Sequence, residues 1–200
     1  MNKKKKKAAD SFIHELAAFL EIAFISLFVT TLIFTYFFRL ATVDGVSMEN
    51  TLHTGERLIT YKFEYEPECG DIVVISCNSS VRLDDNGQPV IGKGMKKVIV
   101  KRVIATGGQT LDIDFERGAV YVDGKMIDEP YITGLTHMDG GAFTGQYPIT
   151  IPEGYIFVMG DNRAVSKDSR YEEVGLIPVE DVIGKAVMRI APLKKIGLVS

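Results

Sequence analysis

The chain has 200 residues, of which 46% are hydrophobic and 24% charged, a balance that is ordinary for a globular protein and excludes intrinsic disorder. This length leaves room for one domain and an appendage. The net charge of -3 hides an asymmetry, because a run of lysines occupies residues 3–7 while acidic residues outnumber basic ones from Arg39 onward. A mildly acidic body argues against nucleic acid as the main partner.

An apolar segment covers residues 16–38, and its only charge before Arg39 is Glu21. Its length suffices to cross a bilayer as a helix. A cleaved signal peptide has a shorter apolar core of about 7–15 residues, and a buried core helix has a polar face, which this segment lacks. By the positive-inside rule we predict a basic cytoplasmic tail (1–15), a transmembrane anchor (16–38) and an external domain (39–200).

The external part contains short runs rich in β-branched residues and separated by turn-forming residues, which predict a mainly β body. The expected strands cover residues 57–63, 71–76, 96–105, 110–114, 119–122, 154–159 and 181–190. Asp123 and Gly124 predict a hairpin turn. Residues 78–94 are polar and predict an exposed loop, residues 128–150 a glycine-rich surface excursion, and residues 192–200 a tail.

The expected strand at 96–105 reads K-K-V-I-V-K-R-V-I-A. Alternate side chains of a strand share a face, and here both faces are apolar except for Lys101 on one and Arg102 on the other, as in a strand covered on both sides. Burial lowers the pKa of a lysine, so we expect the Lys101 amine to be uncharged near pH 7 and able to act as a general base. The alternative is that the side chain extends along the sheet and keeps its ammonium in solvent.

Ser47 follows the predicted anchor by a few residues and is a candidate nucleophile. A serine paired with Lys101 would combine an alcohol with a base that works when buried. A serine–histidine pair is the alternative, but the histidines are poorly placed: one precedes the anchor, one is only six residues from Ser47, and one lies in the glycine-rich segment (His14, His53 and His137).

Cys69 and Cys77 flank the expected strand at 71–76. Eight extended steps of about 3.3 Å separate their Cα atoms by roughly 26 Å, against a bridgeable limit near 7 Å. We therefore predict two unpaired thiols. Neither has the local histidine or electropositive setting of an activated thiolate, and no second pair stands at metal-ligand spacing, so we expect no metal site.

Four motifs occur in order: S-M-x-x-T-L at 47–52, G-D-I-V-V at 70–74, K-R-V-I-A at 101–105, and G-D-N-R-x-x-S-x-D-S-R at 160–170. Together with the anchor they resemble type I signal peptidases, particularly the small single-anchor kind of Gram-positive bacteria. The resemblance implies a membrane-bound serine endopeptidase of coiled antiparallel β-sheets that removes N-terminal signal peptides from exported preproteins. It further implies a Ser-Lys dyad, action at the outer face of the bacterial cytoplasmic membrane, and no cofactor.

The same resemblance implies roles for individual residues. Ser47 would be the nucleophile and Lys101 the general base. Ser166 would lie beside the amine and orient it, and Asp168 and Arg170 would form an ion pair that holds their loop. Shallow pockets for small substrate residues would be lined by Val43, Met48, Leu52, Ile99 and Val100, and the alternative for each of these residues is an ordinary core position.

Three positions depart from the family pattern. Gly45 stands where some relatives carry a serine hydroxyl, so the oxyanion would be bound by backbone groups, with the N–H of Ser47 as the natural donor. Asn50 replaces a usual proline, from which we expect a looser turn. Thr106-Gly107-Gly108 replaces Leu-Pro-Gly or a similar sequence.

Two other functions fit parts of the sequence. A self-cleaving Ser-Lys protease of the repressor type shares the dyad but carries a DNA-binding module in place of a membrane span. An anchored binding module would use Lys101 as an ordinary strand lysine. The predicted partners are preproteins and the lipid bilayer, with no nucleic acid, and the oligomeric state stays open.

Overall fold

The computed structural model describes the backbone of residues 3–199 and the side chains of residues 12–199, so the side chains of most of the predicted basic tail lie outside the described residues. The chain divides after Phe38 into two compact units. The first is the helix α1 (Lys3–Phe37), whose segment Phe12–Phe37 is long and apolar enough to cross a membrane. Within it, the Thr31 and Thr35 hydroxyls donate to backbone carbonyls one turn earlier, so these polar groups are satisfied inside the helix.

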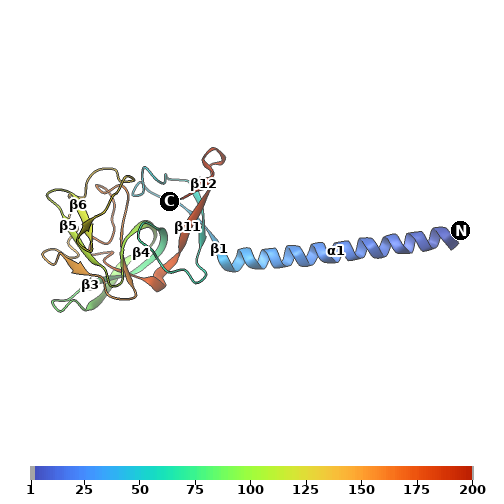
Figure 1. Ribbon diagram of the computed structural model, residues 1–200, viewed down its shortest axis with the longest axis horizontal. Helices are drawn as coiled ribbons and strands as arrows, with labels where there is room; N and C mark the ends of the chain where they lie inside the picture. The colour runs from blue at the N-terminus through green and yellow to red at the C-terminus, as the bar shows by residue number, and fades with distance from the viewer. Residues whose placement is uncertain (1–2, 200) are drawn as a thin grey trace. The chain divides into compact units, whose positions relative to one another are not determined.

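The second unit contains two antiparallel sheets (Figure 1). The larger has the strand order β1-β2-β11-β3-β4-β9-β10, with β12 paired to β11, and the smaller has the order β7-β6-β5-β8. The prediction of a mainly β body is confirmed. The strands of the larger sheet are β1 (Phe38–Thr42), β2 (Arg57–Tyr61), β3 (Ile72–Leu83), β4 (Pro89–Thr106), β9 (Tyr155–Met159), β10 (Ile177–Pro178), β11 (Val182–Ala191) and β12 (Gly197–Leu198).

The smaller sheet consists of β5 (Thr110–Asp114), β6 (Ala119–Val122), β7 (Lys125–Met126) and β8 (Ile149–Thr150), and two 3-10 turns, η1 (Val179–Asp181) and η2 (Leu193–Lys195), complete the body. β5 and β6 have the predicted bounds. The hairpin turn at Asp123 and Gly124 is also confirmed, and both residues have positive φ, 51° and 73°. The predicted strands at 57–63, 154–159 and 181–190 are present with ends shifted by one or two residues, whereas β3 and β4 each extend seven residues beyond the predicted 71–76 and 96–105 on the side of their connection. The predicted tail includes η2 and β12.

The predicted loop at 78–94 is wrong, because β3 and β4 continue through it as one long hairpin. The true turn is short: the Asp84 carboxylate accepts the N–H groups of Asn86 and Gln88 at 2.9 and 2.8 Å. The glycines that suggested a loop mark close packing within the ribbon, since a Cβ at Gly92 would lie 2.9 Å from the Ser80 hydroxyl and one at Gly94 2.6 Å from the Ser79 carbonyl.

The predicted surface excursion at 128–150 is irregular but covers the core. Phe143 is fully buried, with its ring centroid 6.1 Å from that of Phe157 and 6.2 Å from that of Tyr147. It belongs to an apolar cluster that joins β5 and β6 to the far end of the β3–β4 hairpin. The polar composition of residues 128–150 did not indicate this packing, because a few buried side chains are enough to attach a long polar segment to the core.

Two further apolar clusters lie on the two faces of the larger sheet. One contains Val73, Ile75 and Val103, and the other contains Val43, Met48, Leu52, Leu58 and Ile72. The second cluster seats the segment that carries Ser47. Both cysteines are free, as predicted, with Cys69 exposed and Cys77 buried.

Gly175 lies against the backbone of β3, where it forms an isolated bridge with Val81. It has φ +61°, and a Cβ there would clash with the Val81 carbonyl. We predict that Gly175→Ala lowers the free energy of unfolding by about 2–4 kcal/mol, because a strained backbone conformation and a collision with immobile backbone add together. The measurement is chemical unfolding of the detergent-solubilised protein.

Gly87→Ala is the matched control, because Gly87 also has positive φ (+74°), but a Cβ added there would have no neighbour within 4 Å. It should cost only about 1 kcal/mol, the conformational part of the effect. Equal losses in the two variants would contradict the close approach at Val81.

Candidate active site

Lys101 lies on β4 opposite Val73 of β3 and is only 3% exposed. Its amine donates to the Ser47 hydroxyl at 2.8 Å and to the Val100 carbonyl at 2.9 Å. The end of β4 that carries Lys101 is buried on both faces, whereas Val98 is 62% exposed, so the expected two-sided cover holds only from Lys101 onward. The amine does not extend into solvent.

Burial lowers the pKa of Lys101 from 10.5 to about 8, against the opposing influence of the Asp168 and Asp161 carboxylates. The expected direction is confirmed, but the extent is smaller than expected. With this pKa, roughly one amine in ten is neutral at pH 7. The two carboxylates explain the difference, because they favour the charged form.

Ser47 lies in a loop between β1 and β2 whose ends are tied together. The N–H of Val43 donates to the Glu56 carbonyl and the N–H of Gly55 donates to the Val43 carbonyl, both at 2.9 Å. Three apolar side chains of the loop anchor it in the core below Ser47: Val43, Met48 and Leu52. The peptide bond between Glu49 and Asn50 is cis.

The segment after β9 holds this loop from the other side. The Asn162 N–H donates to the Ser47 carbonyl at 3.0 Å. A Cβ at Gly160 would collide with that same carbonyl and with the Ser166 side chain, so only glycine permits this approach. The glycine that opens the 160–170 motif is therefore required where the two segments meet.

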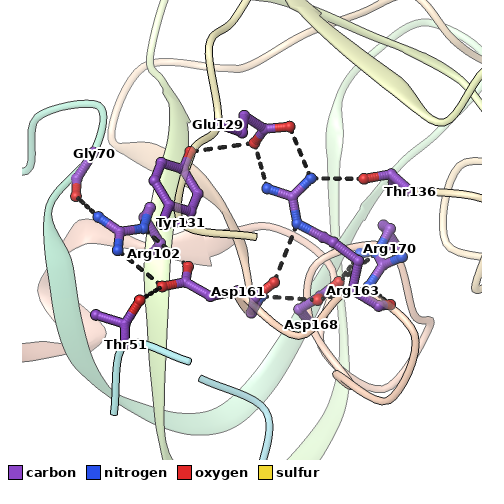
Figure 2. Close-up of polar contacts among 11 residues, drawn as sticks. Thr51, Gly70, Arg102, Glu129, Tyr131, Thr136, Asp161, Arg163, Asp168 and Arg170 are labelled. Carbon is purple, nitrogen blue, oxygen red and sulfur yellow. Dashed lines mark hydrogen bonds and ion pairs between the residues drawn. The ribbon is translucent and has the colours of Figure 1, made fainter. Parts of the chain in front are cut away.

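Arg102 and Asp161 form a buried, two-pronged ion pair beside the dyad, with N–O distances of 2.9 and 2.8 Å (Figure 2). The guanidinium also donates to the Gly70 carbonyl at 2.8 Å and stacks 3.9 Å from the Tyr131 ring centroid. The Thr51 hydroxyl donates to the Asp161 carboxylate at 2.5 Å. These contacts link the strand that carries Lys101 to the loop that carries Ser47.

Asp161 and Thr51 were absent from the predicted site. Both stand in the motifs at 47–52 and 160–170, which was the available signal. Arg102 was noted only as the lone cation on its strand face. A buried cation needs a partner of opposite charge, and the acidic residues of the motifs, such as Asp161, are the natural candidates.

Asp168 and Arg170 form a second, fully buried ion pair, with the Asp168 carboxylate also accepting the Gly160 N–H at 3.0 Å. Arg163 forms a third, with Glu129, and donates to the Thr136 hydroxyl at 2.6 Å (Figure 2). The three pairs lie around one loop and fix it by directional contacts. The four charged residues that define its motif, Asp161, Arg163, Asp168 and Arg170, therefore each have a buried partner.

Ser166 is fully buried, and its hydroxyl makes no hydrogen bond within the described part of the chain. The predicted orienting contact with the Lys101 amine is thus not among the hydrogen bonds of this structure. Gly45 has φ +99°, and both of its backbone groups bond the Thr54 hydroxyl, at 3.1 and 2.9 Å.

A cleft of about 560 Å³ opens beside the dyad. Of the predicted pocket residues, Val43, Met48, Ile99 and Val100 line it, together with Ser47 and Lys101. Leu52 does not line it and is fully buried in the core instead. β9 pairs with β4 only over Arg102–Thr106, so the β9-facing edge of β4 beside the cleft is not paired by that strand.

The two histidines after the anchor contact groups other than the Ser47 hydroxyl. His53 faces Glu56 and Lys195, and His137 faces the Phe115 carbonyl. Burial raises the pKa of both the Cys69 and the Cys77 thiols, which disfavours the thiolate. Among the residues that the structure describes, no group of three or more His, Cys, Asp or Glu side chains could hold a metal ion.

The lowered pKa of Lys101 has a consequence for stability. Since its folded-state pKa of about 8 lies below the ordinary 10.5, keeping the amine charged in the native state costs free energy. The cost is complete below pH 8 and disappears as the pH rises towards 10.5. We predict that Lys101→Met raises the free energy of unfolding at pH 7 by about 1–3 kcal/mol.

Unfolding of wild type and Lys101→Met at pH 7 and pH 10 checks this, and the advantage of the variant should shrink at the higher pH. Lys125→Met, at an exposed lysine in the β6–β7 hairpin, is the control and should change stability by less than about 0.5 kcal/mol. A Lys101→Met protein less stable than wild type at pH 7 would mean that the amine stabilises the native state.

Comparison with known proteins gives a consistent assignment. The family model "Signal peptidase, peptidase S26" matches residues 16–191. The Bacillus licheniformis signal peptidase I is 34% identical over 179 residues, which cover 86% of this chain and 87% of that protein. The Synechocystis "Probable signal peptidase I-2" is 33% identical over 161 residues, covering 79% of this chain and 65% of that protein.

A crystal structure of the Enterococcus faecalis signal peptidase I is 26% identical, with a TM-score of 0.41, and covers 60% of this chain and 97% of that one. The match to the family model extends from within α1 to the last residue of β11 and includes all four motifs. This chain therefore belongs to the signal peptidase family, peptidase S26.

Proposed function

We propose that this protein is a membrane-anchored serine endopeptidase that removes signal peptides from exported preproteins with a Ser47–Lys101 dyad. The observation that carries the proposal is the 2.8 Å contact between the Ser47 hydroxyl and a buried amine whose pKa is lowered to about 8. A serine hydroxyl is a weak nucleophile until a neighbouring base accepts its proton. Family membership supports peptide hydrolysis as the reaction.

In the proposed reaction the neutral Lys101 amine accepts the Ser47 proton as Oγ attacks the scissile carbonyl carbon. The resulting ammonium is held close to the Asp161 and Asp168 carboxylates, which favour its charge. It then gives the proton to the nitrogen of the leaving segment, and the C–N bond breaks. A water molecule, deprotonated by the same amine, hydrolyses the ester on Ser47 and restores the enzyme.

The oxyanion that forms in the attack needs donors placed in advance. We assign the Ser47 N–H to this task. Gly45 supplies no side-chain donor, and its own N–H is bonded to the Thr54 hydroxyl. Ser166, Asp168 and Arg170 have supporting roles in this proposal: Ser166 packs beside Gly160, and the ion pair holds the loop that faces the dyad.

The cleft supports binding of the substrate as an extended strand. The edge of β4 before Arg102 is free of β9 and lies beside the dyad, so it offers backbone groups to an added strand. The walls formed by Val43, Met48, Ile99 and Val100 leave shallow apolar space, which suits small side chains on either side of the substrate backbone.

The proposed location follows from the helix and the charges that flank it. The segment Phe12–Phe37 can span a bilayer, and the lysines before it favour a cytoplasmic N-terminus. The catalytic body would then face the outer side of the bacterial cytoplasmic membrane, where translocated preproteins emerge. Its partners would be those preproteins and the bilayer.

We predict that Ser47→Ala and Lys101→Arg each lose cleavage of a labelled preprotein by at least about 1,000-fold. Alanine removes the nucleophile, and a guanidinium keeps the charge but cannot accept the serine proton. The assay uses detergent-solubilised full-length protein and measures release of the mature product.

Ser76→Ala and Lys185→Arg are the matched controls, made at a β3 serine and a β11 lysine outside the cleft lining, and should retain activity within about twofold. Near-normal cleavage by Lys101→Arg would refute lysine as the base. Absence of any mature product with wild type would favour the anchored binding module.

We predict that kcat/KM rises about tenfold per pH unit below pH 8 and becomes level above it, because the reactive form is the neutral amine with pKa about 8. The measurement uses a peptide substrate without ionisable groups, between about pH 6 and 10. A flat profile on the acid side of pH 8 would contradict an amine base with this pKa.

A further inference from the structure

Glu56 is a buried carboxylate at the base of the loop that carries Ser47, and the proposed chemistry does not use it. It is 2% exposed and accepts hydrogen bonds from Arg189 at 2.8 Å and Lys195 at 3.1 Å. Burial by itself raises the pKa of this carboxyl, but the bonds from Arg189 and Lys195 outweigh it and leave the pKa below 4.5. Glu56 is therefore a charged, fully partnered group within the body.

Arg189, on β11, contacts three parts of the chain at once. One nitrogen, Nη1, donates to the Glu56 carboxylate at 2.8 Å and to the Thr51 carbonyl at 3.3 Å, and Nε donates to the Lys195 carbonyl at 2.7 Å. The guanidinium thus joins the base of the loop, the middle of the loop and the segment after β11. A lysine cannot reproduce this fixed fork of donors.

Thr51 is consequently held through two of its groups, the hydroxyl and the backbone carbonyl. Its hydroxyl bonds the Asp161 carboxylate, which is paired with Arg102 next to Lys101, and its carbonyl accepts from Arg189. Both clamps act on the loop that carries Ser47, four residues before Thr51, and within it the Leu52 N–H is bonded to the Met48 carbonyl at 2.8 Å. Both clamps therefore restrain the loop that carries Ser47.

We propose that Glu56 and Arg189 are positioning residues that set the Ser47 hydroxyl at proton-transfer distance from Lys101. This inference rests on the proposed dyad. Catalysis by a paired nucleophile and base is sensitive to small displacements, and a shift of about 1 Å can cost on the order of 100-fold in rate. Neither residue lines the cleft, so substrate binding should be nearly independent of them.

The test compares Glu56→Gln with wild type in the full-length, detergent-solubilised protein, at a temperature well below the unfolding midpoint of both. Glutamine keeps the shape but loses the charge that orders Arg189. We expect kcat to fall by about 10–100-fold, KM to stay within about twofold, and the apparent pKa of the pH–rate profile to stay unchanged. A kcat within about twofold of wild type would overturn the proposal, even if the variant is less stable.

Glu172→Gln is the matched control, because it removes the same charge from an ion pair with Arg82 at 3.7 Å in which both side chains are largely exposed. It should leave kcat and KM within about twofold of wild type. A fall in kcat equal to that of Glu56→Gln would show a general charge effect and overturn the positioning role.

Arg189→Lys asks whether a charge alone is sufficient. It keeps a cation for Glu56 but not the simultaneous bonds to Thr51 and to the Lys195 carbonyl, so we expect kcat to remain reduced by at least about fivefold. Full wild-type kcat in this variant would overturn the role of Arg189.

Hydrogen exchange supplies a readout that does not need the peptidase reaction. Glu56→Gln should speed exchange of the Leu52 and Gly55 amides at least about tenfold and leave exchange of the β3 amides unchanged. Unchanged exchange at Leu52 and Gly55 would overturn the proposal.

Ser47→Ala, assayed alongside, distinguishes failure of the proposed dyad from failure of the positioning role. If Ser47→Ala still cleaves, the dyad is wrong. An inactive Ser47→Ala together with a fully active Glu56→Gln overturns only the positioning role.

Discussion

The removal of a single ammonium group from water is the constraint on which the structure of this site depends. Lys101 is 3% exposed at a point where β4 is covered on both faces, and its amine has hydrogen bonds only to Ser47 and to its neighbouring carbonyl among those of the described residues. Such burial is unfavourable for the charged form, and this cost is what makes the amine a usable base. Stability and reactivity are therefore opposed at this position.

The charges around Lys101 determine how far burial lowers the pKa of its amine. Asp161 and Asp168 each have an arginine partner, Arg102 and Arg170, so neither is a free counter-ion for the lysine. They nonetheless keep its pKa near 8, above what burial alone would give. Buried ion pairs of this kind contribute little net stability, and we interpret them as devices that specify one arrangement of strand and loops.

Local patterns in the sequence were sufficient for much of the fold. Alternation, β-branched content and turn residues placed β5, β6 and the turn at Asp123 because these features depend on neighbouring residues only. The hairpin over 78–94 was missed because its strands are polar and its glycines, Gly92 and Gly94, serve cross-strand packing, which depends on residues that are distant in sequence. For Leu52 the family resemblance implied a cleft position, with a core position as the alternative, and the structure places its side chain in the core.

The site, like the fold, was predictable only where the signal lies in neighbouring residues of the sequence. Ser47 and Lys101 stand out by residue type, position and motif, and the structure brings them into contact. The network of Thr51, Asp161 and Arg102 was not predictable from spacing, because it joins three segments through side chains whose partners are chosen only after the chain has folded.

A lysine base needs such a network more than a histidine base does. A histidine has a rigid ring and a second nitrogen that a third residue can hold, whereas a lysine amine ends a flexible chain of four methylene groups. Here the Ser166 hydroxyl makes no hydrogen bond within the described residues, so orientation of the Lys101 amine depends on packing and on the Val100 carbonyl. The precise geometry of the dyad must then come from the position of Ser47. This explains why hydrogen bonds close the base of the Ser47 loop and hold Thr51 through both its hydroxyl and its carbonyl. It also explains why Gly160 approaches the loop at a distance that only glycine permits.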